Sequence, residues 1–97
     1  MSAVDEIRRQ LAAKKPYLQD EYNVQEIGIF GSYARDEQGA ASDLDVLVAF
    51  SEPIGLLEFV ALENELADLL GIEVDLVTKD GLKPRVWDHV ADEVVYA

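Results

Sequence analysis

The first apolar pattern along the chain has the period of a helix. Four apolar residues recur at helical spacing: Val4, Ile7, Leu11 and Leu18. Ser2 with Asp5 three residues later is typical of a helix N-cap, and we predict a helix over about residues 3–15. Pro16 should kink or end it, because proline lacks an amide donor and restricts the residue before it. A loop through Asp20-Glu21 is expected to follow.

Two strands are predicted next, separated by a polar segment. Residues 24–30 and 43–50 are rich in Val, Ile, Leu and Phe, which favour extended structure. Gly31 and Ser32 should end the first strand, because both are typical turn residues. A short helical turn is expected from there to Arg35.

The second of these strands carries two carboxylates on one face. Side chains alternate across a strand, so Asp43 and Asp45 point to the same side. The opposite side is apolar: Leu44, Val46, Val48 and Phe50. Positions i and i+2 lie ~6.6 Å apart at Cα, a separation from which two carboxylates can converge on metal ions.

The second half of the chain repeats the alternation of helix and strand. An amphipathic helix is predicted to begin near Leu56 and end at Gly71, and a strand over residues 72–78 follows. Asp75 points away from the buried side of that strand, which makes it a third acidic candidate. Pro84 should begin a last helix. Its apolar stripe is expected to pack on the sheet: Trp87, Val90, Ala91 and Val94.

This order of elements predicts an α/β or α+β domain with a small mixed sheet flanked by helices. At 97 residues, the chain is expected to form one domain over residues 1–97. The start of the sequence lacks the apolar stretch of a signal peptide, and no segment approaches the ~18 apolar residues that span a bilayer. With no cysteine to mark an oxidising compartment, the cytoplasm is the expected location, without membrane contact.

The charge balance is strongly acidic. Twenty acidic residues against 8 basic ones give a net charge of −12, which disfavours direct nucleic-acid binding because both surfaces would be negative. A basic protein partner suits this charge. A solubilising or salt-adapted surface is an equally good interpretation.

The polar positions fit the chemistry of a nucleoside triphosphate. Magnesium takes oxygen ligands, usually one or two carboxylates plus the substrate's own phosphates. Asp43 and Asp45 supply such a pair, and Asp75 could complete it. Gly31 lets the backbone approach a phosphate closely, and Ser32 at the mouth of a helical turn adds a hydroxyl and aligned amides.

Each of these signals also has a structural interpretation. A Gly-Ser pair is usually just a turn, and an Asp-x-Asp at a strand start is more often solvated. Arg35 could aid the phosphates, lock the turn or form a surface salt bridge of little energetic value. Tyr33 could stack on a base but more often such a residue packs locally, while Lys79 and Lys83 could reach phosphates or stay solvated. His89 has no partner at metal spacing.

The Gly-Ser pair and the aspartates favour a nucleotide site more strongly together than singly, because they occur in the order that the chemistry requires. Ten residues lie between Ser32 and Asp43, and Ser42 stands directly before that first aspartate. Residues 31–35 (GSYAR) and 42–48 (SDLDVLV) together resemble the signature of the polymerase-β-type minimal nucleotidyltransferases.

The resemblance implies a polymerase-β-type nucleotidyltransferase fold. It also implies that Asp43 and Asp45 bind Mg²⁺, that Asp75 binds metal or activates the acceptor hydroxyl, and that the nucleotide site includes Gly31, Ser32, Arg35 and Ser42. Family members often carry glycine after the arginine, whereas this chain has Asp36.

Sequences of this size and motif are similar to the antitoxin half of HEPN/MNT toxin–antitoxin pairs. That similarity implies transfer of AMP from ATP to a tyrosine of a HEPN ribonuclease toxin, as in a type VII antitoxin, within a possible hetero-oligomer. Two alternatives remain open. One is neutralisation of a toxin by binding alone. The other is transfer to a small molecule such as an aminoglycoside, which normally needs an acceptor-binding domain that this chain has no residues to build.

Overall fold

The structure is a computed structural model that describes residues 3–97. Helices and strands alternate through most of these residues. The elements are α1 (Ala3–Tyr22), β1 (Val24–Phe30), β2 (Leu44–Phe50), α2 (Leu56–Leu70), β3 (Val74–Thr78), α3 (Pro84–Ala91) and β4 (Val95–Tyr96). Ser2, half of the expected N-cap pair, lies outside the described residues. No helix within residues 3–97 combines the length and apolar character needed to cross a membrane.

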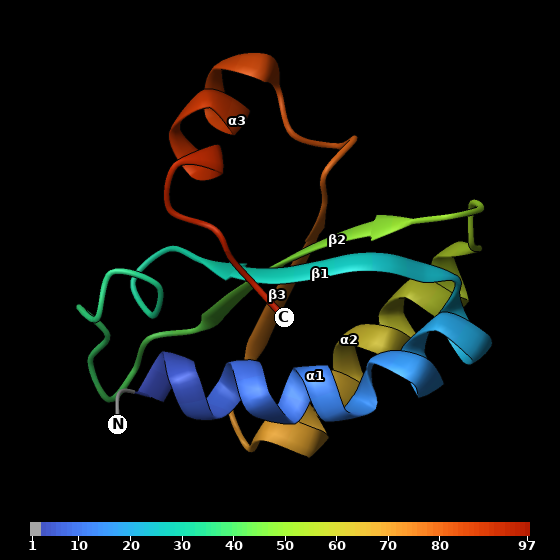
Figure 1. The fold of residues 1–97 in the computed structure, drawn as a ribbon, viewed down its shortest axis with the longest axis horizontal. Helices are drawn as coiled ribbons and strands as arrows, with labels where there is room; N and C mark the ends of the chain where they lie inside the picture. Colours follow the sequence, from blue (N-terminus) through green and yellow to red (C-terminus); the bar gives the residue numbers. More distant parts are fainter. Residues whose placement is uncertain (1–2) are drawn as a thin grey trace.

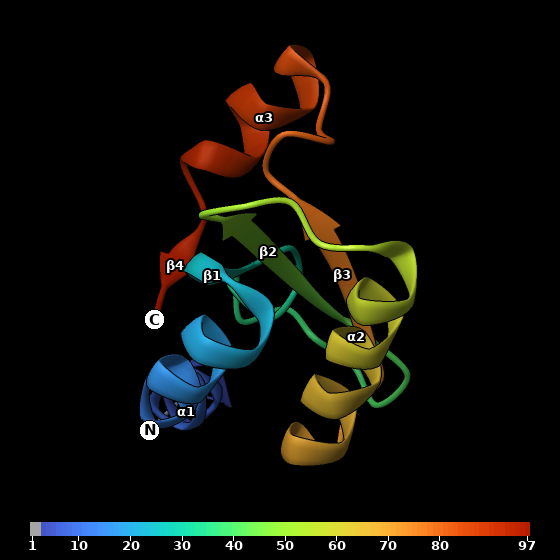
Figure 2. The ribbon, with the colours of Figure 1, turned by 90° about the vertical axis from the view of Figure 1, so that its right-hand side faces the viewer.

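The strands form one mixed sheet (Figure 1), and their order across it is β3-β2-β1-β4. β1 runs antiparallel to both β2 and β4, whereas β2 and β3 are parallel and are joined through α2. Helices α1 and α2 cover one face of the sheet, and α3 lies beyond the other face (Figure 2). The predicted small mixed sheet flanked by helices is confirmed.

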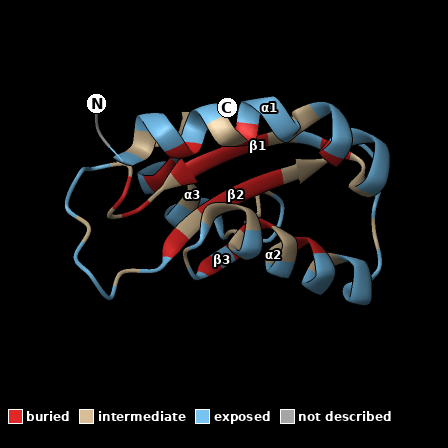
Figure 3. Cartoon of the chain, turned by 90° about the horizontal axis from the view of Figure 1, so that it is seen from below, coloured by how far each residue is buried: buried red, intermediate tan, exposed pale blue. Residues whose placement is uncertain are grey.

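The main core lies between the sheet and the two helices α1 and α2 (Figure 3). Strand pairing places Ile27 opposite Val48 and Ile29 opposite Val46, and all four side chains are fully buried. The helices contribute buried leucines and an isoleucine to the same cluster: Ile7, Leu11, Leu18, Leu62 and Leu66. Each such side chain stabilises the fold by roughly 1.5–3 kcal/mol when buried. The apolar face predicted for residues 43–50 therefore packs on the helices.

The first helix is longer than predicted. It continues through Pro16 to Tyr22, so the prediction of an end near residue 15 and of a loop through Asp20-Glu21 was wrong. Pro16 is exposed on the solvent side, where water can satisfy the carbonyl that loses its amide partner. Leu18 is 1% exposed and lies in the core, so burial of the second half of the helix outweighs the proline penalty.

The C-terminal third departs from the prediction in two ways. Of the stripe expected to pack on the sheet, Val90 is buried, Trp87 and Val94 are half-buried, and Ala91 is exposed. Val90 is separate from the main core cluster, as expected for a residue on the α3 side of the sheet. The short strand β4 was not predicted. It pairs with β1 at the sheet edge, where two residues are too few to show an alternating pattern.

Candidate active site

Two of the predicted carboxylates lie next to each other across the β2–β3 pair. Asp45 is the register partner of Asp75, so their side chains lie on the same face of the sheet, opposite the main core. Asp43 directly precedes β2. Asp43 and Asp75 are exposed, whereas Asp45 is partly buried. The parallel register thus brings together three acidic groups that are 2 to 32 positions apart in the sequence.

The Gly-Ser turn packs directly against Asp45. Phe30, the last residue of β1, pairs with Asp45, which brings the following Gly31 beside the carboxylate. Gly31 has φ 77°, and a Cβ added there would overlap Oδ2 of Asp45 and lie 3.0 Å from its Cγ. Glycine is therefore required here both for its conformation and for its size. Any other residue would displace the aspartate.

The segment after Gly31 is a hydrogen-bonded turn, as predicted. The Arg35 amide donates to the Gly31 carbonyl at 3.2 Å, which is the spacing of a helical turn, and the Glu37 amide donates to the Ser32 carbonyl at 2.8 Å. Asp36 has φ 58°, in the left-handed region that glycine adopts without penalty and aspartate tolerates. This conformation explains why glycine suits the position and how Asp36 can replace it.

Arg35 is held by two carboxylates. Its NH1 lies 2.9 Å from Oε2 of Glu93, and its Nε lies 3.2 Å from Oε2 of Glu37. These contacts raise the pKa of Arg35, the hydrogen bond to Glu93 having the largest effect. Of the interpretations left open for Arg35, the geometry favours a lock on the turn.

Glu93 also accepts a hydrogen bond from the Gly31 amide at 3.1 Å. The sequence gives no motif or spacing that singles out this glutamate. It follows α3 by two residues and reaches the turn only because β4 pairs with β1.

The acidic cluster shifts the titration of its partly buried member. Burial raises the pKa of Asp45, and the neighbouring charges of Asp75 and Asp43 raise it further, while Arg35 opposes them. Negative charge is therefore concentrated around this carboxylate. A cation bound there would relieve the repulsion.

The donor set fits Mg²⁺ by its chemistry. All candidate ligands are carboxylate oxygens, and Mg²⁺ typically takes one or two of these and completes its octahedron with water and phosphate oxygens. No group of three acidic, histidine or cysteine side chains within residues 3–97 is already arranged around a single point for a metal. A pair of aspartates together with a nucleotide's phosphates is the arrangement that the residues allow.

The structure also shows the surroundings of other residues considered from the sequence. The Ser42 hydroxyl accepts a hydrogen bond from the Gly39 amide at 2.9 Å and so shapes its own loop. Tyr33 is 9% exposed and packs in the core, which confirms the local interpretation. Lys79 follows the far end of β3, with its ammonium 4.9 Å from the ring centroid of Trp87. His89 is exposed on α3.

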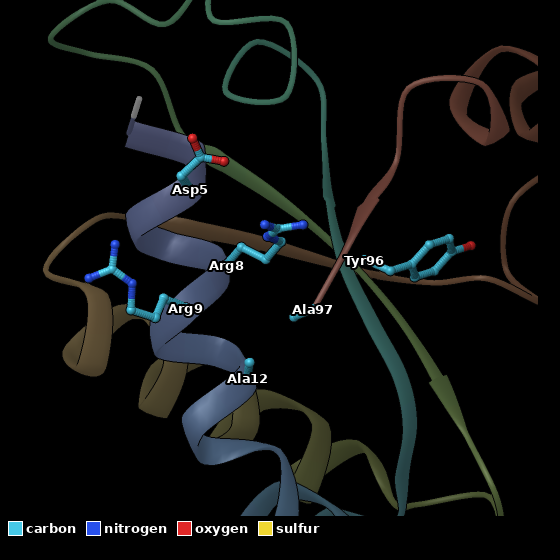
Figure 4. Close-up of a pocket in the computed structure, with 6 residues that line it drawn as sticks. All are labelled: Asp5, Arg8, Arg9, Ala12, Tyr96 and Ala97. Carbon is cyan, nitrogen blue, oxygen red and sulfur yellow. The ribbon is translucent and has the colours of Figure 1, made fainter. Parts of the chain in front are cut away.

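A separate hollow lies between α1 and the end of the chain (Figure 4). It is lined by Asp5, Arg8, Arg9, Ala12, Tyr96 and Ala97. Arg8 extends from α1 toward Ala97, whereas Tyr96 points to the other side of its strand. The hollow flanks β4, two strands away from β2, and contains none of the predicted site residues. The acidic cluster is the better candidate because chemistry and geometry coincide there.

A mixed sheet with paired carboxylates beside a Gly-Ser turn defines the class of nucleotidyltransferase domains. The family model described as "Nucleotidyltransferase domain" matches residues 6–97. The chain belongs to this family, among its minimal members.

Relatives at high coverage support this placement. The protein adenylyltransferase MntA of Thermococcus cleftensis is 47% identical over 96 residues, covering 99% of this chain and 97% of the relative. A Methanocaldococcus jannaschii protein, described as a "putative protein adenylyltransferase", is 45% identical over 97 residues, or 99% of each chain.

Solved structures share the fold. One described as a "putative minimal nucleotidyltransferase" has a TM-score of 0.78 and 37% identity, covering 98% of this chain and 95% of its own. A toxin–antitoxin structure with AMP-PNP has a TM-score of 0.75 at 24% identity, covering 92% of this chain and 70% of its own. At that identity, the second likeness concerns the fold alone.

Proposed function

We propose that this protein is a Mg²⁺-dependent adenylyltransferase that moves AMP from ATP to a tyrosine hydroxyl of a HEPN-family ribonuclease toxin and thereby acts as its antitoxin. The observation that carries the proposal is the register pairing of Asp45 with Asp75 beside the Gly31 turn. The relative from Thermococcus cleftensis, which is named a protein adenylyltransferase, supports a protein acceptor.

In this proposal the carboxylates hold the metal and the turn holds the phosphates. Asp43 and Asp45 are the metal ligands. Mg²⁺, when bound, supplies positive charge against the triphosphate and the developing charge of the transition state. Ser32 supplies its hydroxyl and amide, at the start of the turn, to the phosphates that leave.

The reaction itself is a displacement at phosphorus. The tyrosine oxygen forms a bond to the α-phosphorus of ATP, the bond from that phosphorus to the bridging oxygen breaks, and pyrophosphate leaves. Asp75 is exposed at the edge of the cluster, where a carboxylate can accept the proton of the hydroxyl or bind metal. Catalysis of such a transfer depends mostly on positioning and charge neutralisation, which a domain of this size can provide.

The surface offers two features suited to a protein partner. The net charge of −12 favours association with a basic protein such as a ribonuclease. Three apolar side chains at the outer side of α2 are exposed: Leu56 (77%), Leu57 (86%) and Val60 (44%). Apolar side chains that are exposed together are typical of an interaction surface. We expect the partner to cover them.

The test is the intact mass of a HEPN toxin after incubation with this protein, ATP and Mg²⁺. Transfer by the wild type should add one or more AMP units to the toxin, and an Asp43→Asn/Asp45→Asn double variant should add none while still binding the toxin. A toxin Tyr→Phe variant at the modified position should stay unmodified. A stable complex without added mass would instead favour neutralisation by binding alone.

A further inference from the structure

The C-terminal glutamate Glu93 occupies an unusual position relative to the turn. One carboxylate oxygen accepts a hydrogen bond from the Gly31 amide at 3.1 Å, and the other lies 2.9 Å from NH1 of Arg35. A single side chain therefore holds both the first amide of the Gly-Ser turn and the arginine that closes it. The contact to Arg35 joins two charged groups, and water weakens it because both side chains are partly exposed, so the value of the arrangement lies in its geometry.

The backbone around Glu93 is itself anchored on both sides. The Glu93 amide donates to the Val90 carbonyl at 3.0 Å, which extends the end of α3. On the other side, Val95 pairs with Ile29 of β1. Val94 lies so close to the sheet that a Cβ at Gly28 would be 2.7 Å from its Cγ1. The glutamate is thus presented from a fixed segment.

The position of Gly31 decides the position of Asp45. The aspartate carboxylate fills the space that a Cβ on Gly31 would need, so the two residues are in direct contact. A rotation of the peptide between Phe30 and Gly31 would break the hydrogen bond to Glu93 and change this contact. Glu93 restrains that peptide through its amide hydrogen.

We propose that Glu93 is a positioning residue of the nucleotide site: its carboxylate clamps the Gly31 amide and Arg35, and so sets the turn against Asp45. This inference rests on the proposed function for its effect on nucleotide binding. The clamp itself is a property of the fold that can be measured without any activity.

A matched control exists in Glu37, the second carboxylate on Arg35. Its Oε2 lies 3.2 Å from the Arg35 Nε, but its side chain is more exposed than that of Glu93 (65% against 25%). The Gly31 amide bonds to Glu93 and not to Glu37. Loss of Glu37 therefore removes a charge from Arg35 without releasing the turn.

The first experiment compares amide hydrogen exchange at Gly31 in the wild type, Glu93→Ala, Glu93→Gln and Glu37→Ala. We expect Gly31 exchange to accelerate on the order of 10-fold or more in Glu93→Ala, less in Glu93→Gln, which keeps an acceptor oxygen, and not in Glu37→Ala. Equal protection of Gly31 in all four proteins would overturn the clamp. This readout does not depend on ATP or on a toxin.

The second experiment measures Mg·AMP-PNP affinity and the KM and kcat for AMP transfer in the same variants. Misplacement of a binding group by about 1 Å can cost ~100-fold, so we expect Glu93→Ala to weaken affinity roughly 10- to 100-fold and Glu37→Ala to change it less than about 3-fold. If Glu93 were merely structural, Glu93→Ala would lower the melting temperature with unchanged affinity per folded molecule, and the inference would be wrong. A wild type that binds Mg·AMP-PNP but transfers no AMP would contradict the proposed function and leave the test of Glu93 intact.

Discussion

Replacement of Gly31 by alanine tests the contact on which the candidate site depends. The backbone at Gly31 has φ 77°, where an L-residue costs about 1 kcal/mol, and the new Cβ would overlap the Asp45 carboxylate. Overpacking of this kind typically costs another ~1–3 kcal/mol, so the total expected loss is about 2–4 kcal/mol. A domain of typical stability, ~5–15 kcal/mol, remains folded after such a loss.

Gly71 provides the matched control, since it ends α2 with φ 68° and has no atom within 4 Å of an added Cβ. Gly71→Ala should cost only the conformational term of about 1 kcal/mol. Urea unfolding at pH 7 with a chelator present gives both stabilities, and calorimetry with Mg·AMP-PNP gives the affinities. The rate of AMP transfer to the toxin is measured for both variants as well.

The two variants should separate in function more than in stability. We expect Gly31→Ala to lose roughly 100-fold or more in transfer, because Asp45 must rotate away, while Gly71→Ala keeps wild-type transfer. If Asp45 rotates away without cost, Gly31→Ala will lose no more stability than Gly71→Ala. Nucleotide binding by Gly31→Ala should still fail in that case. Equal stability together with equal binding and transfer in the two variants would refute the argument that Gly31 positions Asp45.

Three further predictions concern single side chains. Asp45→Asn should raise the free energy of unfolding by about 1 kcal/mol at pH 7 without metal, because it removes a partly buried charge that the neighbouring charges of Asp75 and Asp43 also repel, and it should abolish stabilisation by Mg²⁺. The pKa of Asp45 is raised in the folded state, so the stability gained from its protonation is fully present below the unfolded pKa and is lost as the pH rises through the folded pKa. Urea unfolding in a chelator from pH 3 to 7 should show this pH-dependent component in the wild type and not in Asp45→Asn. Identical pH profiles of the two proteins would count against it. Pro16→Ala should stabilise the protein by about 1–2 kcal/mol in thermal unfolding, since it restores an amide donor inside α1, and a loss of stability would show that the proline is accommodated without cost. Glu63→Ala should lower the free energy of unfolding by about 1–3 kcal/mol, because Oε2 of Glu63 accepts a hydrogen bond from the Leu76 amide at 2.9 Å. Asn64→Ala, on the exposed side of α2, should change the free energy of unfolding in urea by less than ~0.5 kcal/mol. Equal effects of the two substitutions would show that this hydrogen bond contributes nothing.

The sequence alone was sufficient for the local features of the site. Alternation along residues 43–50 placed Asp43 and Asp45 on the face away from the core. Val46 and Val48 lie in the main core cluster, whereas Leu47, which is also buried, lies outside it, which confirms that alternation. Outside the site, Gly71 was expected to end a helix and does so in the left-handed conformation. These features depend on a few neighbouring residues, and their periods are short enough to be visible in the chain.

The length of α1 could not be predicted, because a local effect competes with a tertiary one. Pro16 disfavours the helix locally, but Leu18 is buried against the sheet, and only the assembled core shows that the burial prevails.

The tertiary structure alone decided how the separate pieces of the site meet. The parallel register of β2 and β3 makes Asp75 the neighbour of Asp45, and the pairing of β4 with β1 brings Glu93 onto the Gly31 amide. No local period encodes either contact, since each joins residues 30 or more positions apart and depends on backbone pairing between separate strands. The sequence therefore determined which side chains the site has available, whereas strand pairing determined which of them touch, because register is a property of two strands packed together and not of either one alone.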